Sequence, residues 1–314
     1  MTQVQLQISS YNCNGLGNFI KRKEVFTWLN DKPYNIICLQ ETHSTLSVET
    51  MWQNEWGGSI IFSHGTSSQR GTAILFKNNI NPDIHQIKTD INGRWVIIDL
   101  TIDSYRFCLV NLYAPNEDSP EFFTNLSVEL ENFVDCNENL IITGDFNTVQ
   151  NPLVDRHSTN RSYHTKALEC ISELKCKYDL HDIWRFRNPK DIRYTWRRRL
   201  QASRIDYFLV SFSLINRVNK CIIGDRFRSD HNLIALSFIT AEFPRGKGFW
   251  KFNTSLLEDK LFHKKTVEIM KEFFSNNCGT ANPHSVWEAA KGFFRGHSIK
   301  FSSWKNKQYL AREK

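Results

Sequence analysis

The sequence predicts an α/β protein in which two β-sheets pack face to face and helices cover their outer sides. Three observations support this fold class. Apolar, strand-like runs alternate with helix-like segments, several of the runs come in pairs, and polar side chains repeatedly follow the strand ends. Sheets and helices must each bury an apolar face, and a layered sandwich buries all of them. We expect a cleft at the rim where the polar strand ends meet.

The composition is that of a globular protein. The chain has 314 residues, of which 40% are hydrophobic and 13% aromatic, enough for one large domain or two small ones. No apolar stretch approaches 18 residues, so we expect no membrane span, and the polar N-terminus does not resemble a signal peptide. The eight cysteines show no C-x-x-C pairing, which indicates a reducing, intracellular compartment.

The first elements alternate strand and helix. Residues 4–10 alternate apolar and polar side chains and predict a strand, which runs into a turn rich in Asn and Gly. Residues 20–30 predict a helix, and residues 35–39 form the continuous apolar run of a buried strand. That run ends at Glu41, where a carboxylate is costly unless it faces water or a cation.

The middle of the chain repeats this design. The runs at 59–62 and 72–76, and those at 95–102 and 106–112, predict two pairs of strands. A helix is expected over 120–134, a buried strand over 139–143, a loop over 148–162 and a helix over 166–177. The strand at 139–143 ends at Asp145 and Asn147, as the earlier one ended at Glu41. Residues 193–196 and 203–211 flank a basic segment in the manner of a hairpin whose tip is 197–202.

A short polar motif, Ser229-Asp230-His231, directly precedes the strand predicted at 233–239. Asp206 lies within the strand predicted at 203–211. If the two strands are neighbours, Asp206 can accept a hydrogen bond from one imidazole nitrogen of His231 and leave the other facing a substrate. The alternative is an ordinary surface turn, which is the commoner fate of an isolated tripeptide of this kind.

The basic residues are unevenly distributed. Residues 241–314 contain 14 Lys and Arg against 7 Asp and Glu, whereas residues 1–240 contain 26 of each, so the net charge of +7 belongs to the tail. Within the main part, residues 185–204 hold eight basic side chains and one acidic one. We therefore expect a domain over 1–240, followed over 241–314 by a basic, aromatic linker with a helix at 255–275 and the start of a further region.

The polar side chains at the strand ends indicate a metal-assisted hydrolase. They are three or four carboxylates, amides and one histidine, without cysteine: Asn14, Glu41, Tyr113, Asp145, Asn147, Asp206, Asp230 and His231. Such an oxygen-rich set suits Mg²⁺ or Mn²⁺ better than zinc. The chain contains no G-x-S-x-G, P-loop or G-x-G-x-x-G motif. The set fits hydrolysis of a phosphate ester by an activated water.

Six motifs in this order resemble the endonuclease/exonuclease/phosphatase superfamily, which implies the four-layered, DNase I-like sandwich. They are Y-N-C-N-G-L (11–16), L-Q-E-T-H (39–43), N-L-Y-A-P-N (111–116), G-D-F-N (144–147), R-I-D-Y (204–207) and S-D-H (229–231). Y-T-W before a basic hairpin, R-I-D-Y-F-L-V-S and F-W-K-F-N further resemble the apurinic-endonuclease-like N-terminal domain of non-LTR (LINE-type) retrotransposon polyproteins.

The resemblance assigns a role to each strand-end residue. It implies Mg²⁺, with Mn²⁺ as an alternative, held chiefly by Glu41 with Asn14 nearby and Asp230 as a ligand or a carboxylate behind one. It implies a catalytic set in which Asp145 orients or deprotonates the water. Asn147 and Tyr113 would contact the phosphate, and Asp206 and His231 would form a dyad. Whether Asp145 or His231 takes the proton, and whether one ion or two serve, stays open.

The substrate-binding side chains implied by the resemblance are mostly basic. They are Arg156, Thr195, Arg197, Arg198, Arg199, Arg204 and Ser229. The alternatives are a solvated hairpin for the three consecutive arginines and an ion pair with Asp155 for Arg156.

The activity implied is a DNA endonuclease that nicks double-stranded DNA and leaves a 3′-OH to prime reverse transcription. The partners implied are a reverse transcriptase domain of the same polyprotein and, through residues 241–314, the element's RNA. The resemblance implies action in the nucleus and allows a cytoplasmic ribonucleoprotein as well. The alternatives are an apurinic/apyrimidinic-site repair endonuclease, a phosphatase of lipids or inositides, and an inactive DNA-binding module.

Overall fold

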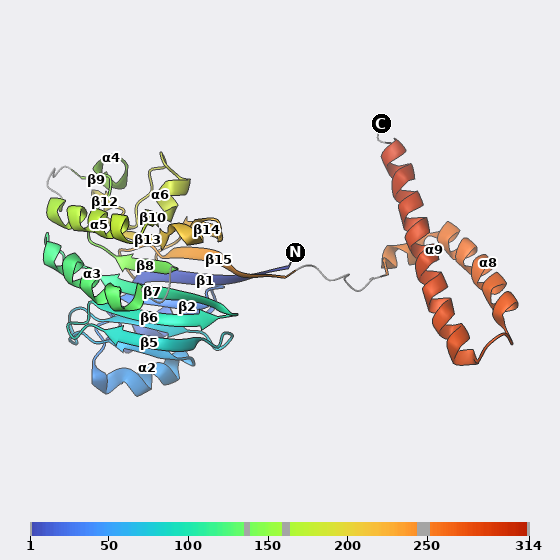
Figure 1. The fold of residues 1–314 in the computed structure, drawn as a ribbon, viewed down its shortest axis with the longest axis horizontal. Coiled ribbons are helices and arrows are strands. Elements are labelled where there is room, and N and C mark those ends of the chain that lie inside the picture. The colour runs from blue at the N-terminus through green and yellow to red at the C-terminus, as the bar shows by residue number, and fades with distance from the viewer. Residues whose placement is uncertain (1, 135–138, 159–163, 244–251, 313–314) are drawn as a thin grey trace. The chain divides into compact units, whose positions relative to one another are not determined.

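The computed structural model describes residues 2–134, 139–158, 164–243 and 252–312. Contacts divide the chain into two units, Met1–Pro244 and Arg245–Lys314 (Figure 1). The division falls four residues after the boundary expected at 240, because the last strand of the first unit continues to Phe243. Within the described residues, no helix has the length and apolar character needed to cross a membrane.

The first sheet contains six strands. In chain order they are β1 (Thr2–Asn12), β2 (Ile36–Gln40), β3 (Ile60–Ser63), β4 (Thr72–Phe76), β14 (Val218–Ile223) and β15 (Ile234–Phe243). Their order across the sheet is β14-β15-β1-β2-β4-β3. β1 lies parallel to β2, with Asn12 opposite Gln40, and antiparallel to β15, with Ser10 opposite Ile234. The end of β1, the end of β2 and the start of β15 therefore meet at one edge.

The second sheet also contains six strands. They are β5 (Asp83–Thr89), β6 (Trp95–Ile102), β7 (Tyr105–Tyr113), β8 (Leu140–Asp145), β10 (Leu180–Asp182) and β13 (Asp206–Ser211). Their order is β10-β13-β8-β7-β6-β5. β7 and β8 are parallel, with Tyr113 opposite Asp145, and β13 pairs antiparallel with β8, which places Asp206 opposite Asp145.

Three apolar clusters make the layers. One lies between the sheets and joins residues such as Ile8 and Ile36 of the first to Leu109 and Phe208 of the second. The outer face of the first sheet is covered by α1 (Phe19–Asn30) and α2 (Glu49–Trp56). The outer face of the second is covered by α3 (Pro120–Val134) and α5 (Thr165–Lys177), which lie side by side in Figure 1. The predicted α/β sandwich of four layers is confirmed.

Shorter elements build the rim. They are the 3₁₀ turn η1 (Leu46–Val48), the helices α4 (Pro152–Asp155), α6 (Ile183–Arg187) and α7 (Phe212–Ile215), and the strands β9 (Arg156–His157), β11 (Trp196–Arg198) and β12 (Gln201–Ser203). The last three form a small sheet, β11-β12-β9. The loop expected over 148–162 was thus partly wrong, because it contains α4 and β9; its residues 159–162 lie outside the described residues. The helix α2 and the strands β5 and β14 were not predicted.

The second unit is a helical hairpin. It consists of a 3₁₀ turn η2 (Thr254–Glu258), α8 (Lys260–Asn277) and α9 (Pro283–Arg312). The predicted helix at 255–275 corresponds to η2 and α8, whereas α9 was not predicted. Phe252, Phe262, Phe294 and Phe301 form an apolar cluster between the helices. Residues 249–251, part of the aromatic F-W-K-F-N segment, lie outside the described residues.

Gly144 permits the close approach of β8 to β7 directly before Asp145. It lies opposite Leu112 with φ +140°, and a Cβ atom there would lie 1.9 Å from the Leu112 carbonyl oxygen. Any side chain at 144 must therefore push the two strands apart at the point that carries Asp145.

We predict that Gly144→Ala lowers the free energy of unfolding of the first unit by about 1–3 kcal/mol, because the added methyl overlaps backbone rather than a flexible side chain. Urea denaturation followed by near-UV circular dichroism would measure it. Gly17→Ala is the matched control, since its Cβ would find its nearest neighbour at 3.9 Å. Equal stability of the two variants would contradict this account of Gly144.

Candidate active site

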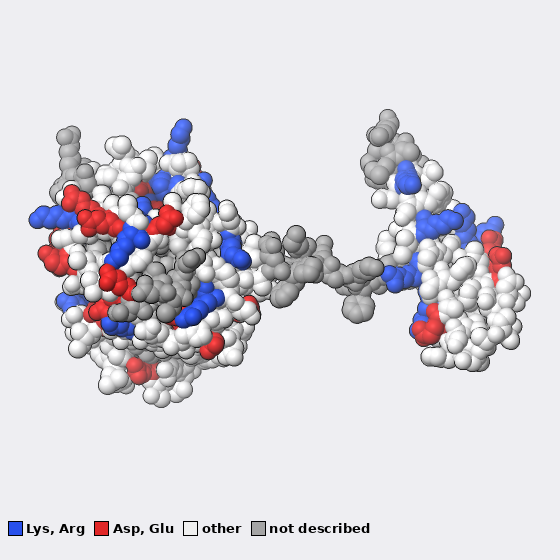
Figure 2. Space-filling model, viewed as in Figure 1, with Lys and Arg blue, Asp and Glu red and all other residues white. Residues whose placement is uncertain are grey.

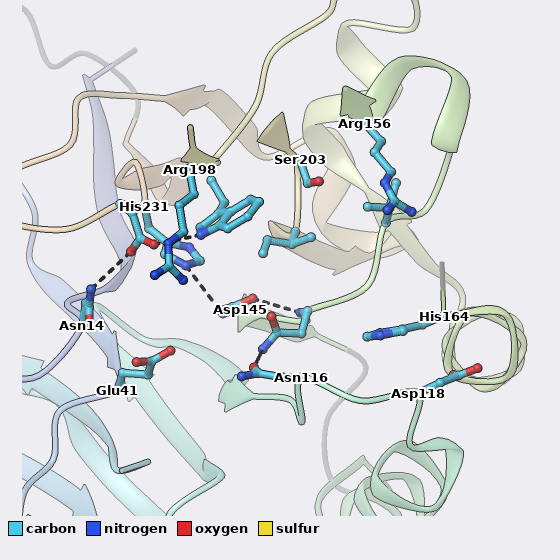
Figure 3. A pocket seen from close by; sticks show the side chains of 15 residues that line it. Asn14, Glu41, Asn116, Asp118, Asp145, Arg156, His164, Arg198, Ser203 and His231 are labelled. Atoms are coloured by element: carbon cyan, nitrogen blue, oxygen red, sulfur yellow. Dashed lines mark hydrogen bonds and ion pairs between the residues drawn. The ribbon is translucent and has the colours of Figure 1, made fainter. Parts of the chain in front are cut away.

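The strand ends surround one cavity of about 880 Å³ at the rim of the sandwich (Figure 3). Six of the eight strand-end residues singled out in the sequence line it: Asn14, Glu41, Asp145, Asn147, Asp230 and His231. They come from both sheets, because the parallel pairs β1–β2 and β7–β8 end at the same edge. The other two, Tyr113 and Asp206, are buried and contact members of this set.

Asp206 and His231 form the predicted dyad. His231 Nδ1 lies 2.9 and 3.1 Å from the two carboxylate oxygens of Asp206. Its other ring nitrogen, Nε2, lies 3.7 Å from Asp145 Oδ2. All three residues are at most 5% exposed. Asp206 therefore fixes the orientation of the imidazole and directs Nε2 towards Asp145 and the cavity.

This buried cluster holds positive charge on the imidazole. Burial disfavours protonated His231, but the carboxylates of Asp206 and Asp145 outweigh burial and raise the pKa of His231 to about 10. Burial, followed by the charge of Asp206, raises the pKa of Asp145 to about 7, although His231 and the Asn147 N–H oppose that shift. The site can therefore combine a cationic donor with a carboxylate of raised basicity, which suits proton transfer near neutral pH.

Asn12, which was not among the predicted site residues, joins the two sheets at the site. Its buried Nδ2 donates to Glu41 Oε1 at 3.0 Å and to Asp145 Oδ2 at 2.9 Å. Its Oδ1 accepts from the Asn14 backbone N–H at 3.0 Å. Asn12 and Asn14 both occur in the Y-N-C-N-G motif, and only the pairing of β1 with β2 reveals which one points inward.

A second amide network lies beneath the site and was also missed. Gln40 Nε2 donates to Asn111 Oδ1 at 2.6 Å, and Asn111 Nδ2 donates to the carbonyls of Leu39 and Ala73, each at 2.9 Å. Gln40 belongs to the first sheet and Asn111 to the second, and both are fully buried. The network fixes the two strand ends relative to each other, because a buried amide without a partner costs about 1–3 kcal/mol.

Asn147 lines the cavity beside Asp145, and the buried Tyr113 contacts Glu41. Asn147 Nδ2 donates to the Ala114 carbonyl and to Asn116 Oδ1, each at 2.9 Å, and its backbone N–H donates to Asp145 Oδ1 at 2.9 Å. Burial, followed by the negative charge of Glu41, raises the pKa of the Tyr113 phenol well above its usual value. Tyr113 therefore keeps its proton and can donate a hydrogen bond.

Three polar residues of the site have left-handed backbones. Asn14 has φ 48°, Glu41 has φ 50° and Asn147 has φ 48°. Asparagine tolerates this conformation, whereas glutamate pays a steric cost on the order of 1 kcal/mol or more. In each case the turn follows the end of a strand. The backbone thus stores strain at the position where the carboxylate of Glu41 enters the cavity.

The donor set on one side of the cavity fits a hard divalent cation. Glu41 and Asp230 supply carboxylate oxygens and Asn14 an amide oxygen, and Asn14 Nδ2 lies 3.4 Å from Asp230 Oδ1. Asp145, Asp206 and His231 also bring ligand atoms within 4.8 Å of one another. That cluster, however, is buried, whereas Glu41 and Asp230 are partly exposed and Asn14 is exposed at the cavity. The first set is therefore the better candidate for a metal.

The basic hairpin is attached to the catalytic segment. Trp196 pairs with His231, the Arg197 N–H donates to the Asp230 carbonyl at 3.1 Å, and Trp196 Nε1 donates to Asp230 Oδ2 at 3.0 Å. The side chains of Arg198 and Arg156 line the cavity, as Figure 3 shows. Residues 197 to 199 are exposed, and Arg197 lies over the Tyr194 ring. The hairpin can thus present cations beside the cleft.

Two of the expected substrate contacts were wrong. Arg204 is buried, with its side chain 1% exposed, and it pairs with Asp155 at 2.7 Å and Asp182 at 2.6 Å. Thr195 is also buried, and its hydroxyl accepts from the backbone N–H groups of Ile205 and Asp206, each at 3.1 Å. Both residues hold the base of the hairpin in place and leave no side-chain surface for a substrate.

Asp155 and Ser229 also have structural contacts. Asp155 pairs with Arg185 as well as Arg204, while Arg156, the residue expected to be its alternative partner, lines the cavity. The Ser229 hydroxyl donates to the Asn12 carbonyl at 2.8 Å and accepts from the His231 N–H at 3.2 Å. These contacts tie the Ser229-Asp230-His231 segment to the end of β1. A substrate contact by Ser229 stays a prediction.

Comparison with known proteins relates most of the chain to nucleases. The model of the Endonuclease/Exonuclease/phosphatase family matches residues 9–231. A Xenopus laevis protein, "Transposon TX1 uncharacterized 149 kDa protein", is 30% identical over 292 residues, 91% of this chain. The chain spans about a fifth, 22%, of that relative's length. An exodeoxyribonuclease of Bacillus subtilis is 23% identical over 256 residues, which are 72% of this chain and 96% of that protein.

Solved structures share the fold. An AP endonuclease from Leishmania major superposes with a TM-score of 0.66 at 19% identity, covering 75% of this chain and 88% of that one. The catalytic domain of Xenopus laevis APE2 gives 0.62 at 20% identity, covering 75% and 92%. A Neisseria 3′ phosphatase bound to a product DNA hairpin gives 0.60 at 21% identity, covering 74% and 99%.

We predict that Arg204→Met lowers the free energy of unfolding by about 3–5 kcal/mol, because it leaves Asp155 and Asp182 as buried carboxylates short of a partner. Arg197→Met, which removes an exposed cation of the same hairpin, should change stability by at most about 0.5 kcal/mol. Urea denaturation would measure both. If Arg204→Met is as stable as Arg197→Met, the ion pairs do not hold the hairpin base.

Proposed function

The chain belongs to the endonuclease/exonuclease/phosphatase family, and we propose that it is a divalent-metal-dependent endonuclease that nicks double-stranded DNA. One observation carries this proposal: Asp206, His231 and Asp145 form a buried chain of contacts that ends at a cavity whose other wall bears Glu41 and Asp230. An acid–base group and a hard-cation set that face one cavity are what hydrolysis of a phosphodiester requires.

The residues divide the chemistry between them. Asp145 accepts a proton from the attacking water, because its raised pKa makes it a stronger base than an exposed aspartate. The water oxygen bonds to phosphorus, the P–O3′ bond breaks, and the leaving oxygen takes a proton from solvent water to give the 3′-OH. Protonated His231, held by Asp206, donates to a phosphate oxygen as negative charge develops. Tyr113 can supply a further donor, and Asn147 can do so by exchanging one of its bonds to Ala114 or Asn116.

Glu41, with Asn14 and Asp230, would hold a divalent cation, and the ion would polarise the phosphate and offset its charge. Mg²⁺ is the preferred candidate and Mn²⁺ the alternative, since every donor in this set is oxygen. The amide of Asn12 supports Glu41 and Asp145 from below and sets the spacing between the metal side and the water side.

The DNA backbone would lie along the exposed side of the β11–β12 hairpin. Arg197, Arg198 and Arg199 supply the charge there, and Arg156 adds a cation on the cavity wall. The Xenopus relative supports a transposon role, because its similarity extends over 91% of this chain, beyond the nuclease motifs. In that role the nick would leave a 3′-OH that primes a reverse transcriptase of the same polyprotein in the nucleus.

Repair of apurinic/apyrimidinic sites is the second candidate. It is supported by the fold shared with AP endonucleases and by the exodeoxyribonuclease relative. The two functions differ in substrate: the first needs intact duplex and the second an abasic site. The same preparation can therefore be offered supercoiled plasmid, an abasic oligonucleotide duplex and an inositol phosphate, with Mg²⁺ and with a chelator.

We predict that Glu41→Gln, Asp145→Asn and His231→Ala each lower the rate of Mg²⁺-dependent plasmid nicking on the order of a thousandfold, because each removes a group that touches the metal, water or phosphate. Gel separation of supercoiled and nicked plasmid gives the rate. DNA polymerase should extend the nick directly, which reports a 3′-OH. Glu131→Gln, a surface carboxylate on α3 paired with Lys177, is the matched control and should keep the parental rate.

Near-parental nicking by any of the three variants would remove that residue from the mechanism. Nicking of plasmid at a rate far below cleavage of the abasic duplex would favour the repair function. No cleavage of any substrate by the parental chain with Mg²⁺ or Mn²⁺ would favour the inactive DNA-binding module.

We predict that replacing Arg197, Arg198 and Arg199 together by Ala weakens duplex binding and changes which positions are nicked. The log–log salt slope should fall by about 0.9 unit for each phosphate that is no longer neutralised. Salt-dependent fluorescence anisotropy and mapping of nick positions would test this. The control replaces Lys271, Lys291 and Arg295 by Ala and removes the same charge from the second unit. An unchanged slope and nick pattern in the hairpin variant would show that these arginines only face solvent.

A further inference from the structure

The charge of the second unit lies at one end of its helical hairpin. Residues 266–299, the end that contains the turn between α8 and α9, have three basic and three acidic side chains. The opposite end, residues 252–265 and 300–312, has seven basic and two acidic side chains. Figure 2 shows the blue side chains gathered towards this end and a mostly white surface near the turn. We call residues 252–265 and 300–312 the basic end.

Cations and an aromatic ring from both helices meet at the basic end. Lys265 Nζ of α8 lies 5.2 Å from the ring centroid of Trp304 of α9, and Trp304 is 42% exposed. Burial, followed by the charges of Lys265 and Lys300, lowers the pKa of the nearby His297. Charges from both helices therefore act on the same side chain, His297. The ion pair of Lys305 with Asp259 engages one of the seven cations there.

The apolar cluster holds this arrangement in place. Phe262 of α8 packs against Phe294 and Phe301 of α9, with ring centroids 6.4 and 5.2 Å away, and Phe301 contacts Trp304 at 5.4 Å. Phe262 and Phe301 are buried. The fixed position of Trp304 reduces the conformational entropy that binding would cost. An exposed ring with Lys265 beside it and further lysines in the same end of the hairpin is the combination that stacks bases and contacts phosphates of single-stranded nucleic acid.

We propose that the basic end binds single-stranded nucleic acid, with Trp304 as a stacking platform and Lys264, Lys265 and Lys300 as phosphate contacts. This site is independent of the nuclease cavity and of the function proposed for it. RNA and single-stranded DNA offer the same phosphates and base faces, so the experiment includes both.

The test compares two charge-matched variants of the full chain. Lys264, Lys265 and Lys300 are replaced by Ala in one, and Lys271, Lys291 and Arg295 in the other, so each loses three cations from the same unit. Binding of fluorescein-labelled 20-nucleotide RNA and single-stranded DNA is followed by anisotropy against salt, with chelator present so that nothing is cleaved. We expect the salt slope to fall by about two units in the first variant, at about 0.7 unit per phosphate contact, and to be unchanged in the second.

Trp304→Ala tests the stacking, with Trp287→Ala as its control, because Trp287 is 57% exposed near the neutral end. We expect Trp304→Ala to weaken binding roughly fivefold or more and Trp304→Tyr to restore it, since tyrosine also stacks. Far-UV circular dichroism verifies that both helices persist.

Equal loss in the two charge variants, or loss in neither, would overturn the proposal and favour a protein partner for this surface. A loss of duplex binding in the first charge variant as large as its loss of single-strand binding would also overturn it, because a stacking platform needs unpaired bases. If Trp304→Ala behaves like Trp287→Ala, the aromatic part of the proposal is wrong. Plasmid nicking is measured in parallel and should be unchanged in the first variant, so that failure of this proposal is distinguishable from failure of the nuclease function.

Discussion

Burial of Asp145 next to Asp206 is the constraint on which the rest of the first unit depends. Two carboxylates in one buried cluster repel each other, and each loses the hydration that would stabilise its charge. The imidazole of His231 and the amide of Asn12 offset that cost by direct contact. These groups come from β1, β8, β13 and the segment before β15, so both sheets must be correctly paired before the two carboxylates have their partners. Formation of the site and completion of the fold are therefore linked.

Much of the fold could be predicted because its strands are apolar and its polar residues follow their ends. The helix at 120–134 and the strands at 72–76 and 95–102 have the predicted bounds. β5 was missed because it lies at a sheet edge, where its side chains are mostly exposed and give no apolar run. α2 was missed because its two buried residues, Trp52 and Trp56, occur in an otherwise polar segment.

For single side chains of the site, too, the contacts with segments far away in sequence were the part that could not be predicted. The Asp206–His231 pair was predictable from the motif order, because β13 and the segment before β15 each deliver one member to the same edge. Asn12 could not be separated from Asn14 without the strand register. Arg204 borders a basic hairpin, which made a DNA contact the natural expectation. Its carboxylate partners, Asp155 and Asp182, are 49 and 22 residues away in sequence, so nothing local indicated that it was buried.

The buried ion pairs of Arg204 have a consequence for how such a protein can diverge. A substitution at 204, 155 or 182 alone leaves a buried charge short of its partner, so these positions can change only together. The exposed tip of the hairpin carries no such restriction, because its side chains face solvent. Substitutions are therefore tolerated at the tip of the hairpin, while the residues at its base, which align the hairpin with the cavity, stay the same. The tip can therefore change without a loss of folding stability.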